Sequence, residues 1–237
     1  MREQLLRHVP AVLVEKVPRD HREPDHLWRR RRRVVTGTLA VGSALLERSL
    51  SAEPDSTAFY RLTAAVAGTW VTGGLASGPL HLGRELRGDA LRRPLVTPMA
   101  FGVGAFGLFY GLALVAREVP ILQRHISSVL DYAVEGSTAK ILLTTLANGA
   151  AEEVFFRGAL YASVADHPVA LSTLAYTATT VATRNPALVL AAGVMGTLFG
   201  LQRRGSGGIQ APLITHVTWS TLMLRFLPPL FRGANRA

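Results

Sequence analysis

The stretch from Pro94 to Ala116 reads PLVTPMAFGVGAFGLFYGLALVA and carries no charged residue. Residues 62–80 form a second uncharged and mostly apolar stretch. Runs of about 18 or more such residues are typical of helices that cross a lipid bilayer. The two stretches therefore predict an all-α fold, a polytopic bundle of transmembrane helices, rather than a soluble domain.

The composition agrees with a membrane protein and narrows its chemistry. Of the 237 residues, 49% are hydrophobic and 18% are charged, whereas about 25% of the residues in ordinary soluble domains are charged. The chain contains no cysteine. Disulfides, cysteine nucleophiles and cysteine-ligated zinc are therefore excluded.

The distribution of apolar runs predicts about seven spans, with a range of roughly six to eight. We expect these spans over residues 34–50, 58–80, 94–116, 139–165, 168–183, 186–202 and 209–226. Residues 117–138 are mixed in charge, which predicts an interfacial helix. Residues 1–33 read as a basic tail with a short surface helix over residues 2–16, and residues 34–237 as the transmembrane domain.

Basic residues predict the orientation of the chain. The net charge is +10, and an unbroken run of arginines extends from Arg29 to Arg33, just before the first predicted span. Lys and Arg gather beside spans on the cytoplasmic face of membranes, so the run predicts a cytoplasmic N-terminus. A basic cluster can also bind nucleic acids. No nucleic-acid-binding pattern follows this run, and we expect no nucleic-acid partner.

Two adjacent carboxylates, Glu152 and Glu153, lie inside the predicted span over residues 139–165. A charge in a membrane helix costs about 2.5–3.5 kcal/mol on insertion scales, so such residues usually serve a function. Glu153 and Arg157 have the i, i+4 spacing that favours an ion pair on one helical face. Glu152 points about 100° away and can hold a water, a metal ion or a proton. The alternative is that the Glu–Arg pair only fixes helix packing.

The last predicted span carries His216, Trp219 and Ser220 within about one helical turn. At about 1.5 Å per residue, His216 lies roughly 10 Å and Glu152 roughly 20 Å from the cytoplasmic ends of their helices. With modest tilt we expect these two side chains to meet in one site. Glutamate and histidine serve as zinc ligands and general bases in hydrolases without cysteine, although the sequence lacks an HExxH pattern. A lone histidine can also simply bond neighbouring helices.

These residues resemble the CAAX-protease and bacteriocin-processing family of intramembrane proteases, also called the Abi family. Its first motif, Glu-Glu-x-x-x-Arg, stands here as EEVFFR at Glu152–Arg157. Its third motif, His-x-x-x-Asn or Asp, stands as HVTWS at His216–Ser220. Its second motif, Phe-x-x-x-His, aligns best with YTATT at Tyr176–Thr180, where both defining residues differ. The resemblance covers residues 139–227.

The resemblance implies an intramembrane endopeptidase that cleaves a membrane-associated or prenylated-type peptide from the cytoplasmic side. Glu152 would activate water, alone or with a Zn²⁺ ion held by Glu152 and His216. Glu153 and Arg157 would fix the helix, and His216 would bind the metal or stabilise the oxyanion. The residues that would line or support the substrate site are Tyr176, Thr180, Trp219 and Ser220.

The expected partners are membrane lipids and a membrane-associated peptide or protein substrate, and the expected location is the bacterial cell membrane. Two other functions stay open. The first is that the chain is a catalytically silent relative that binds a membrane partner, because Thr180 and Ser220 depart from the motifs. The other is a proton-coupled transporter with Glu152 as its relay, although the sequence shows no inverted repeats of broken helices.

Overall fold

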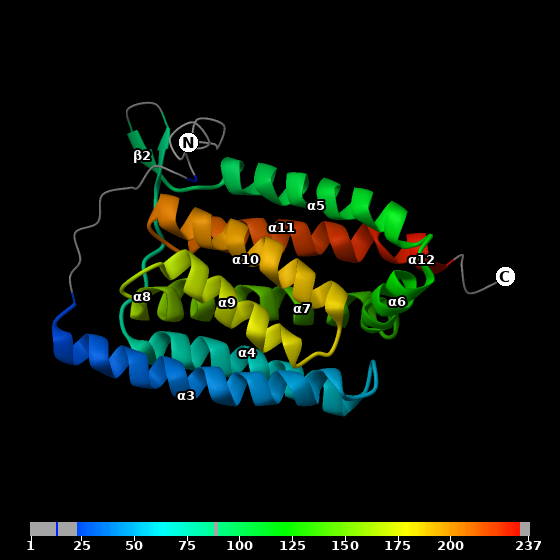
Figure 1. The fold of residues 1–237 in the computed structure, drawn as a ribbon, viewed down its shortest axis with the longest axis horizontal. Helices are drawn as coiled ribbons and strands as arrows, with labels where there is room; N and C mark the ends of the chain where they lie inside the picture. Colours follow the sequence, from blue (N-terminus) through cyan, green and yellow to red (C-terminus); the bar gives the residue numbers. More distant parts are fainter. Residues whose placement is uncertain (1–12, 14–22, 88–89, 233–237) are drawn as a thin grey trace.

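The computed structural model describes residues 13, 23–87 and 90–232, and these residues form a bundle of long helices with one β-hairpin (Figure 1). This confirms the predicted helical bundle. The helical segments are α3 (Asp25–Leu50), α4 (Thr57–Ser77), α5 (Val96–Ala116), α6 (Pro120–Val134), α7 (Thr138–Glu152), η1 (Glu153–Leu160), α8 (Tyr161–Ser163), α9 (Pro168–Val181), α10 (Pro186–Ser206), α11 (Gln210–Phe226) and α12 (Pro228–Arg232). The strands β1 (Glu85–Arg87) and β2 (Ala90–Arg92) pair antiparallel.

Most predicted helices appear where the apolar runs placed them, and α6 occupies the region predicted to be an interfacial helix. The first helix differs, because α3 begins at Asp25 rather than at residue 34. Arginine favours helices, and Arg31 turns inward, where its guanidinium pairs with Glu23 and donates to Ser77 Oγ at 3.2 Å. The arginine run therefore belongs to the helix. The predicted surface helix over residues 2–16 lies, apart from Leu13, outside the described residues.

Two of the described helices are long and apolar enough to cross a membrane, namely α5 and α10. Judged by helix length and composition, the described residues therefore do not confirm the predicted number of about seven spans. The reason lies in the sequence of the other helices. The Arg run lies within α3, and α9 and α11 have only 14 and 17 residues, whereas a spanning helix needs about 20.

The helices stack around a central one. In Figure 1, α3 and α4 line one long side of the bundle and α5 lies along the opposite side. The continuous rod of α7 and η1 lies between them and packs against both α4 and α11. In turn, α11 packs against α5, and α9 packs against α10. This arrangement surrounds Glu152 and Glu153, at the α7–η1 junction, with other helices.

An aromatic cluster fixes the central rod against α3 and α4. The Trp70 ring stacks on Phe155, with 4.7 Å between ring centroids, and also contacts Phe156 at 5.1 Å. All three side chains are buried. Gly42 of α3 makes this packing possible, because a Cβ atom at that position would overlap the Trp70 ring. The cluster therefore holds η1 in place next to the two glutamates.

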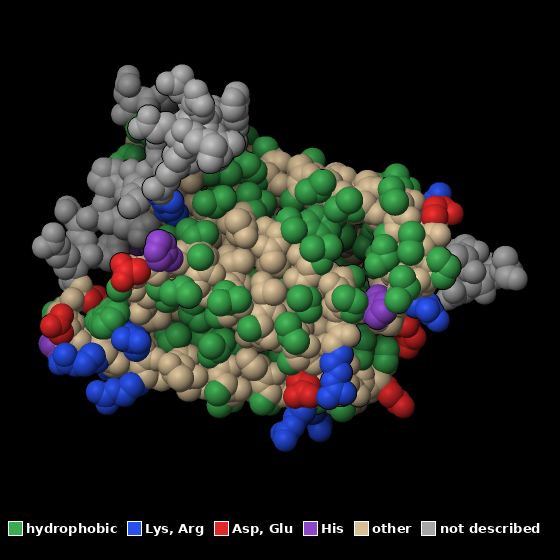
Figure 2. Space-filling model, in the orientation of Figure 1, with side chains coloured by type: hydrophobic (Ala, Val, Ile, Leu, Met, Phe, Trp, Pro, Cys, Tyr) green, Lys and Arg blue, Asp and Glu red, His purple; other side chains and the backbone are tan. Residues whose placement is uncertain are grey.

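The face drawn in Figure 2 has the charge distribution expected of a membrane-embedded bundle. In Figure 2, the charged side chains gather toward the two ends of the molecule, and hydrophobic and uncharged side chains cover the middle. Large apolar side chains of α5 are exposed, among them Val103, Leu108, Leu112 and Val115. Charge-free middle sections of this kind suit contact with lipid.

Candidate active site

The two glutamates lie where the central rod changes its winding. Glu152 is the last residue of α7, and Glu153 is the first residue of η1, a π-helix of 8 residues. We predicted an uninterrupted helix here, and the rod continues, but with a different hydrogen-bond pattern. π-Helical turns are rare and occur frequently at functional sites. The altered winding determines which neighbouring helix each glutamate faces.

Glu153 is completely buried and contacts nitrogen atoms of two side chains. Its Oε1 atom lies 3.4 Å from Arg157 Nη1, so the predicted i, i+4 ion pair is confirmed. The same oxygen lies 2.9 Å from His216 Nδ1 on α11. Glu153 thus links its own helix to α11 through a buried carboxylate.

His216 meets the cluster through a hydrogen bond with Glu153, a contact that we did not predict. The joint action of His216 with Glu152 stays a prediction. The two glutamates have different hydrogen-bond partners: Glu153 bonds to α11, whereas Glu152 bonds to α9. Sequence spacing defines the angle between two neighbours on a helix, but not which of them faces a given helix.

Glu152 is half-buried and is held by α9. The Tyr176 hydroxyl donates a hydrogen bond of 2.8 Å to Glu152 Oε2. Among the described residues, the second oxygen, Oε1, accepts no hydrogen bond. One oxygen of this carboxylate is therefore anchored, and the other can accept a proton.

The His216 ring is fixed on several sides. It stacks on Phe199 with 4.8 Å between ring centroids and an interplanar angle of 22°. Gly149 of α7 gives it room, because a Cβ atom there would lie 3.3 Å from His216 Nε2. With Nδ1 bonded to a carboxylate, Nε2 is the nitrogen that remains for other chemistry. The ring orientation resembles that of catalytic histidines oriented by an acidic residue.

Arg157 is fully buried and held mainly by aromatic faces. Its guanidinium carbon lies 4.5 Å from the Tyr176 ring centroid and 5.1 Å from that of Phe199. None of its three side-chain nitrogens makes a hydrogen bond among the described residues, and Glu153 Oε2 has no hydrogen-bond partner there either. Buried polar atoms are usually satisfied by water or a ligand when no protein partner is present. The cluster is therefore a polar region suited to water within an apolar bundle.

The remaining predicted site residues lie near the cluster without entering its hydrogen bonds. Thr180 donates to the Tyr176 carbonyl oxygen, one turn earlier on α9, at 2.9 Å. Ser220 is buried, but within the described residues no hydrogen bond joins it to His216. The Trp219 ring lies 6.0 Å from the His216 ring. Among the described residues, Thr180 and Ser220 therefore form no hydrogen bond with the glutamates.

The donor set does not fit a typical zinc site. Within the described part of the chain, no group of three or more His, Cys, Asp and Glu side chains is placed to hold a metal ion. Both of these contacts of Glu153 use Oε1, which leaves Glu153 Oε2, Glu152 Oε1 and His216 Nε2 as donor atoms, but the three side chains are not placed to hold one ion together. Catalytic zinc sites usually have three protein ligands. We therefore derive no reaction step through a metal.

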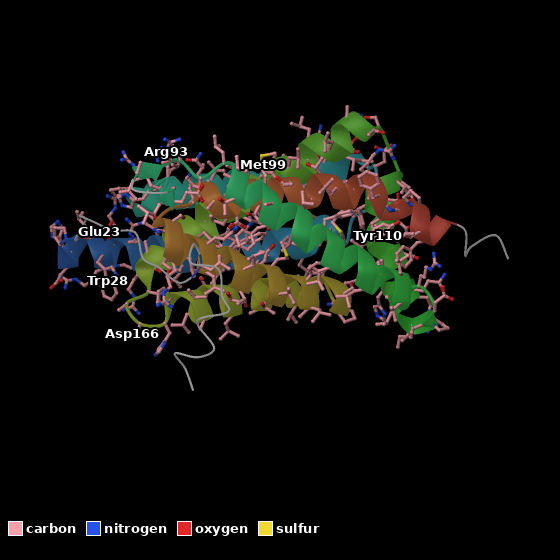
Figure 3. All side chains as sticks on the ribbon, turned by 90° about the horizontal axis from the view of Figure 1, so that it is seen from above. Glu23, Trp28, Arg93, Met99, Tyr110 and Asp166 are labelled. Carbon is pink, nitrogen blue, oxygen red and sulfur yellow. The ribbon has the colours of Figure 1, made fainter. Side chains whose placement is uncertain are left out.

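A cavity of about 1120 Å³ opens at one end of the bundle. Its lining includes Glu23, Trp28 and Asp166, which Figure 3 shows at the same end of the molecule. Arg203 forms part of the wall and links the cavity to the glutamate cluster, because its Nε donates to the Arg157 carbonyl oxygen at 2.7 Å. The cavity lining does not include the two glutamates.

Sequence reasoning missed several supporting residues. Gly149, Phe199 and Arg203 all contact the cluster, yet none was a predicted site residue. Gly149 had a usable signal, since it stands one helical turn before Glu153 and leaves one face of the rod open. Phe199 and Arg203 lie on α10, far away in the sequence, and only the fold brings them near.

Comparison with known families supports the resemblance to CAAX proteases. Residues 135–222 match the family described as type II CAAX prenyl endopeptidase, Rce1-like. The match includes both glutamates, Arg157, Tyr176 and His216. No curated protein and no solved structure matches the chain. Residues 135–222, less than half of the chain, are thus similar to a family of membrane-embedded CAAX-type endopeptidases. The family description mentions neither a metal nor bacteriocin processing.

Proposed function

We propose that this chain, whose residues 135–222 match the Rce1-like family, is an intramembrane endopeptidase that uses Glu152 to activate water. The observation that carries the proposal is the half-buried Glu152 carboxylate, which is anchored through Oε2 only. It lies beside Glu153, which orients His216. A proton acceptor and an oriented imidazole at membrane depth are the groups that peptide hydrolysis requires.

In the proposed reaction, Glu152 Oε1 takes a proton from water as the water oxygen attacks the scissile carbonyl carbon. The carbonyl π bond becomes the oxyanion of a tetrahedral intermediate. The C–N bond then breaks, and the proton held by Glu152 passes to the leaving amine. The products are a new carboxyl terminus and a new amino terminus, and the glutamate returns to its starting state.

His216 would stabilise the oxyanion in this scheme. Protonated at both nitrogens, it donates Nδ1–H to Glu153 and has Nε2–H available for the oxyanion. The Glu153 carboxylate, 2.9 Å from Nδ1, would hold the ring in the orientation that this role needs. Arg157 balances the charge of Glu153 and holds that carboxylate in place.

The proposed substrate is a membrane-associated peptide of the prenylated type, cleaved on the cytoplasmic side of a bacterial cell membrane. The family description supports a prenylated substrate. The basic end of α3 supports a cytoplasmic N-terminus, because arginines beside spans favour that face. Membrane lipids would then be the other partner of the apolar middle section.

Hydrolysis can be tested with the purified protein in liposomes. A prenylated peptide is incubated in H₂¹⁸O, and the products are identified by mass spectrometry. We expect a single cleavage site and one ¹⁸O atom in the new carboxyl terminus. Glu152→Ala should abolish the product, whereas Glu135→Gln, at an exposed glutamate after α6, should not change its rate. Equal turnover by wild type and Glu152→Ala would refute the proposal.

Two alternative proposals use the same preparation. The first alternative is that the protein binds the peptide without cleaving it. It is suggested by Thr180 and Ser220, which make no hydrogen bond to the glutamates, and it predicts binding of the peptide without product. A zinc-dependent reaction predicts stoichiometric zinc in wild type and its loss in Glu152→Gln and His216→Ala. Metal analysis of these three proteins separates the metal-dependent scheme from the glutamate scheme.

A further inference from the structure

Tyr176 is the residue through which α9 reaches the proposed general base. Its hydroxyl donates a hydrogen bond of 2.8 Å to Glu152 Oε2. The bond joins a phenol and a carboxylate from two helices, and the two residues are 24 positions apart in the chain. Hydrogen bonds to a carboxylate are roughly twice as strong as those between neutral groups. Within the described residues, no other side chain forms a hydrogen bond with Glu152. The orientation of its carboxylate therefore depends on this contact.

The Tyr176 ring cannot easily turn away from Glu152. One edge meets the Phe156 ring, with 4.9 Å between centroids and an interplanar angle of 65°. The Arg157 guanidinium lies over the ring at 4.5 Å. On a third side, Gly196 of α10 approaches so closely that a Cβ atom there would lie 3.3 Å from Tyr176 Cδ1. A ring held in this way presents its hydroxyl at a fixed point.

The neighbouring polar residue of α9 does not share this role. Thr180 bonds to the Tyr176 carbonyl oxygen, which satisfies its hydroxyl within the helix. The polar contact that α9 makes with the glutamates therefore comes from position 176 and not from position 180. In the motif that α9 resembles, the order is reversed, with an apolar residue first and a polar residue four positions later.

We propose that Tyr176 is a positioning residue that acts through Glu152, and this inference rests on the proposed function. By holding Oε2, the Tyr176 hydroxyl leaves Oε1 directed at the position of the attacking water. The residue has no contact with the reacting atoms in this scheme. It sets the direction of the carboxylate on which proton transfer depends.

Removal of the single hydroxyl oxygen tests this role. In Tyr176→Phe, the ring contacts with Phe156 and Arg157 persist, and the bond to Glu152 is lost. We expect kcat for the prenylated peptide to fall about 10- to 100-fold, as for loss of a hydrogen bond to a charged group. KM should stay unchanged. The control is Tyr161→Phe, which removes the hydroxyl of another buried tyrosine while its ring still contacts Arg203.

Infrared spectroscopy supplies a second readout that does not depend on turnover. The difference between each protein and its own Glu152→Gln variant isolates the bands of the Glu152 carboxyl group. We expect these bands to shift in Tyr176→Phe and to stay in place in Tyr161→Phe. Two results would overturn the role of Tyr176. One is that the Glu152 bands do not shift in Tyr176→Phe. The other is that Tyr176→Phe has a normal kcat while Glu152→Gln is inactive. Shifted bands in a protein with no hydrolytic activity would support the contact and refute the proposed function alone.

Discussion

Arg157→Met should destabilise the bundle strongly, because it removes the charge that balances Glu153 in the protein interior. Both side chains have an exposed fraction of 0%, and the pair is separated by 3.4 Å. Removal of one partner from a buried ion pair usually costs about 3–5 kcal/mol. His216 can stay bonded to the same oxygen, so we expect the lower end of this range, about 3 kcal/mol. Methionine retains most of the contact with the surrounding aromatic rings.

The loss can be measured as a thermal midpoint in detergent micelles. For a chain of this length, about 3 kcal/mol corresponds to a fall of roughly 6–12 °C. The matched control is Arg117→Met, which breaks the ion pair with Glu118, also on the membrane bundle but exposed to solvent. Surface pairs contribute about 0–1 kcal/mol, so the control should shift by no more than roughly 4 °C.

A double variant separates the loss of charge balance from the loss of packing. In Glu153→Gln/Arg157→Met neither member of the pair is charged, and we expect the double variant to be more stable than Arg157→Met alone. If Arg157→Met and Arg117→Met shift the midpoint equally, the buried pair does not stabilise the fold in the way that we describe. A double variant that is less stable than both single variants would also contradict the explanation.

Two further predictions concern small and large residues around the cluster. Gly149→Ala places a methyl group 3.3 Å from His216 Nε2. We expect peptide turnover to fall several-fold, because the ring is fixed and cannot give way. The control is Gly107→Ala, where no atom lies within 4 Å of the added Cβ and turnover should not change. Trp70→Ala removes the ring that stacks on Phe155 and should cost about 3–5 kcal/mol in the free energy of unfolding, which chemical denaturation monitored by circular dichroism can measure. A loss below about 1 kcal/mol would show that the aromatic cluster does not hold the central rod.

The helices were largely predictable from the sequence, because apolar runs and prolines mark their extent. Pro94–Ala116 led directly to α5, and Pro168 and Pro186 mark the beginnings of α9 and α10. The start of α3 was not predictable in this way. A run of arginines looks like a solvated tail, and only the buried contact of Arg31 with Ser77 shows that it continues a helix.

One contact of the candidate site was predictable from the sequence, whereas the contacts between helices were not. The i, i+4 rule gave the Glu153–Arg157 contact, which depends on one helix alone. The contact of His216 with Glu153 depends on the rotation of α11 about its axis and on the π-helical winding of η1. Both are set by packing between helices. The contact of Tyr176 with Glu152 depends in the same way on how α9 lies against the central rod.

The rate of peptide cleavage by Glu152→Gln, measured in liposomes under single-turnover conditions, tests the role of this carboxylate most directly. Glutamine has the same shape and can keep a bond to Tyr176, but it cannot accept the proton of water. Loss of a general base typically lowers the rate about 10²- to 10⁴-fold, and we expect a fall in this range with peptide binding unchanged. A cleavage rate equal to that of wild type would contradict glutamate-activated hydrolysis by this protein.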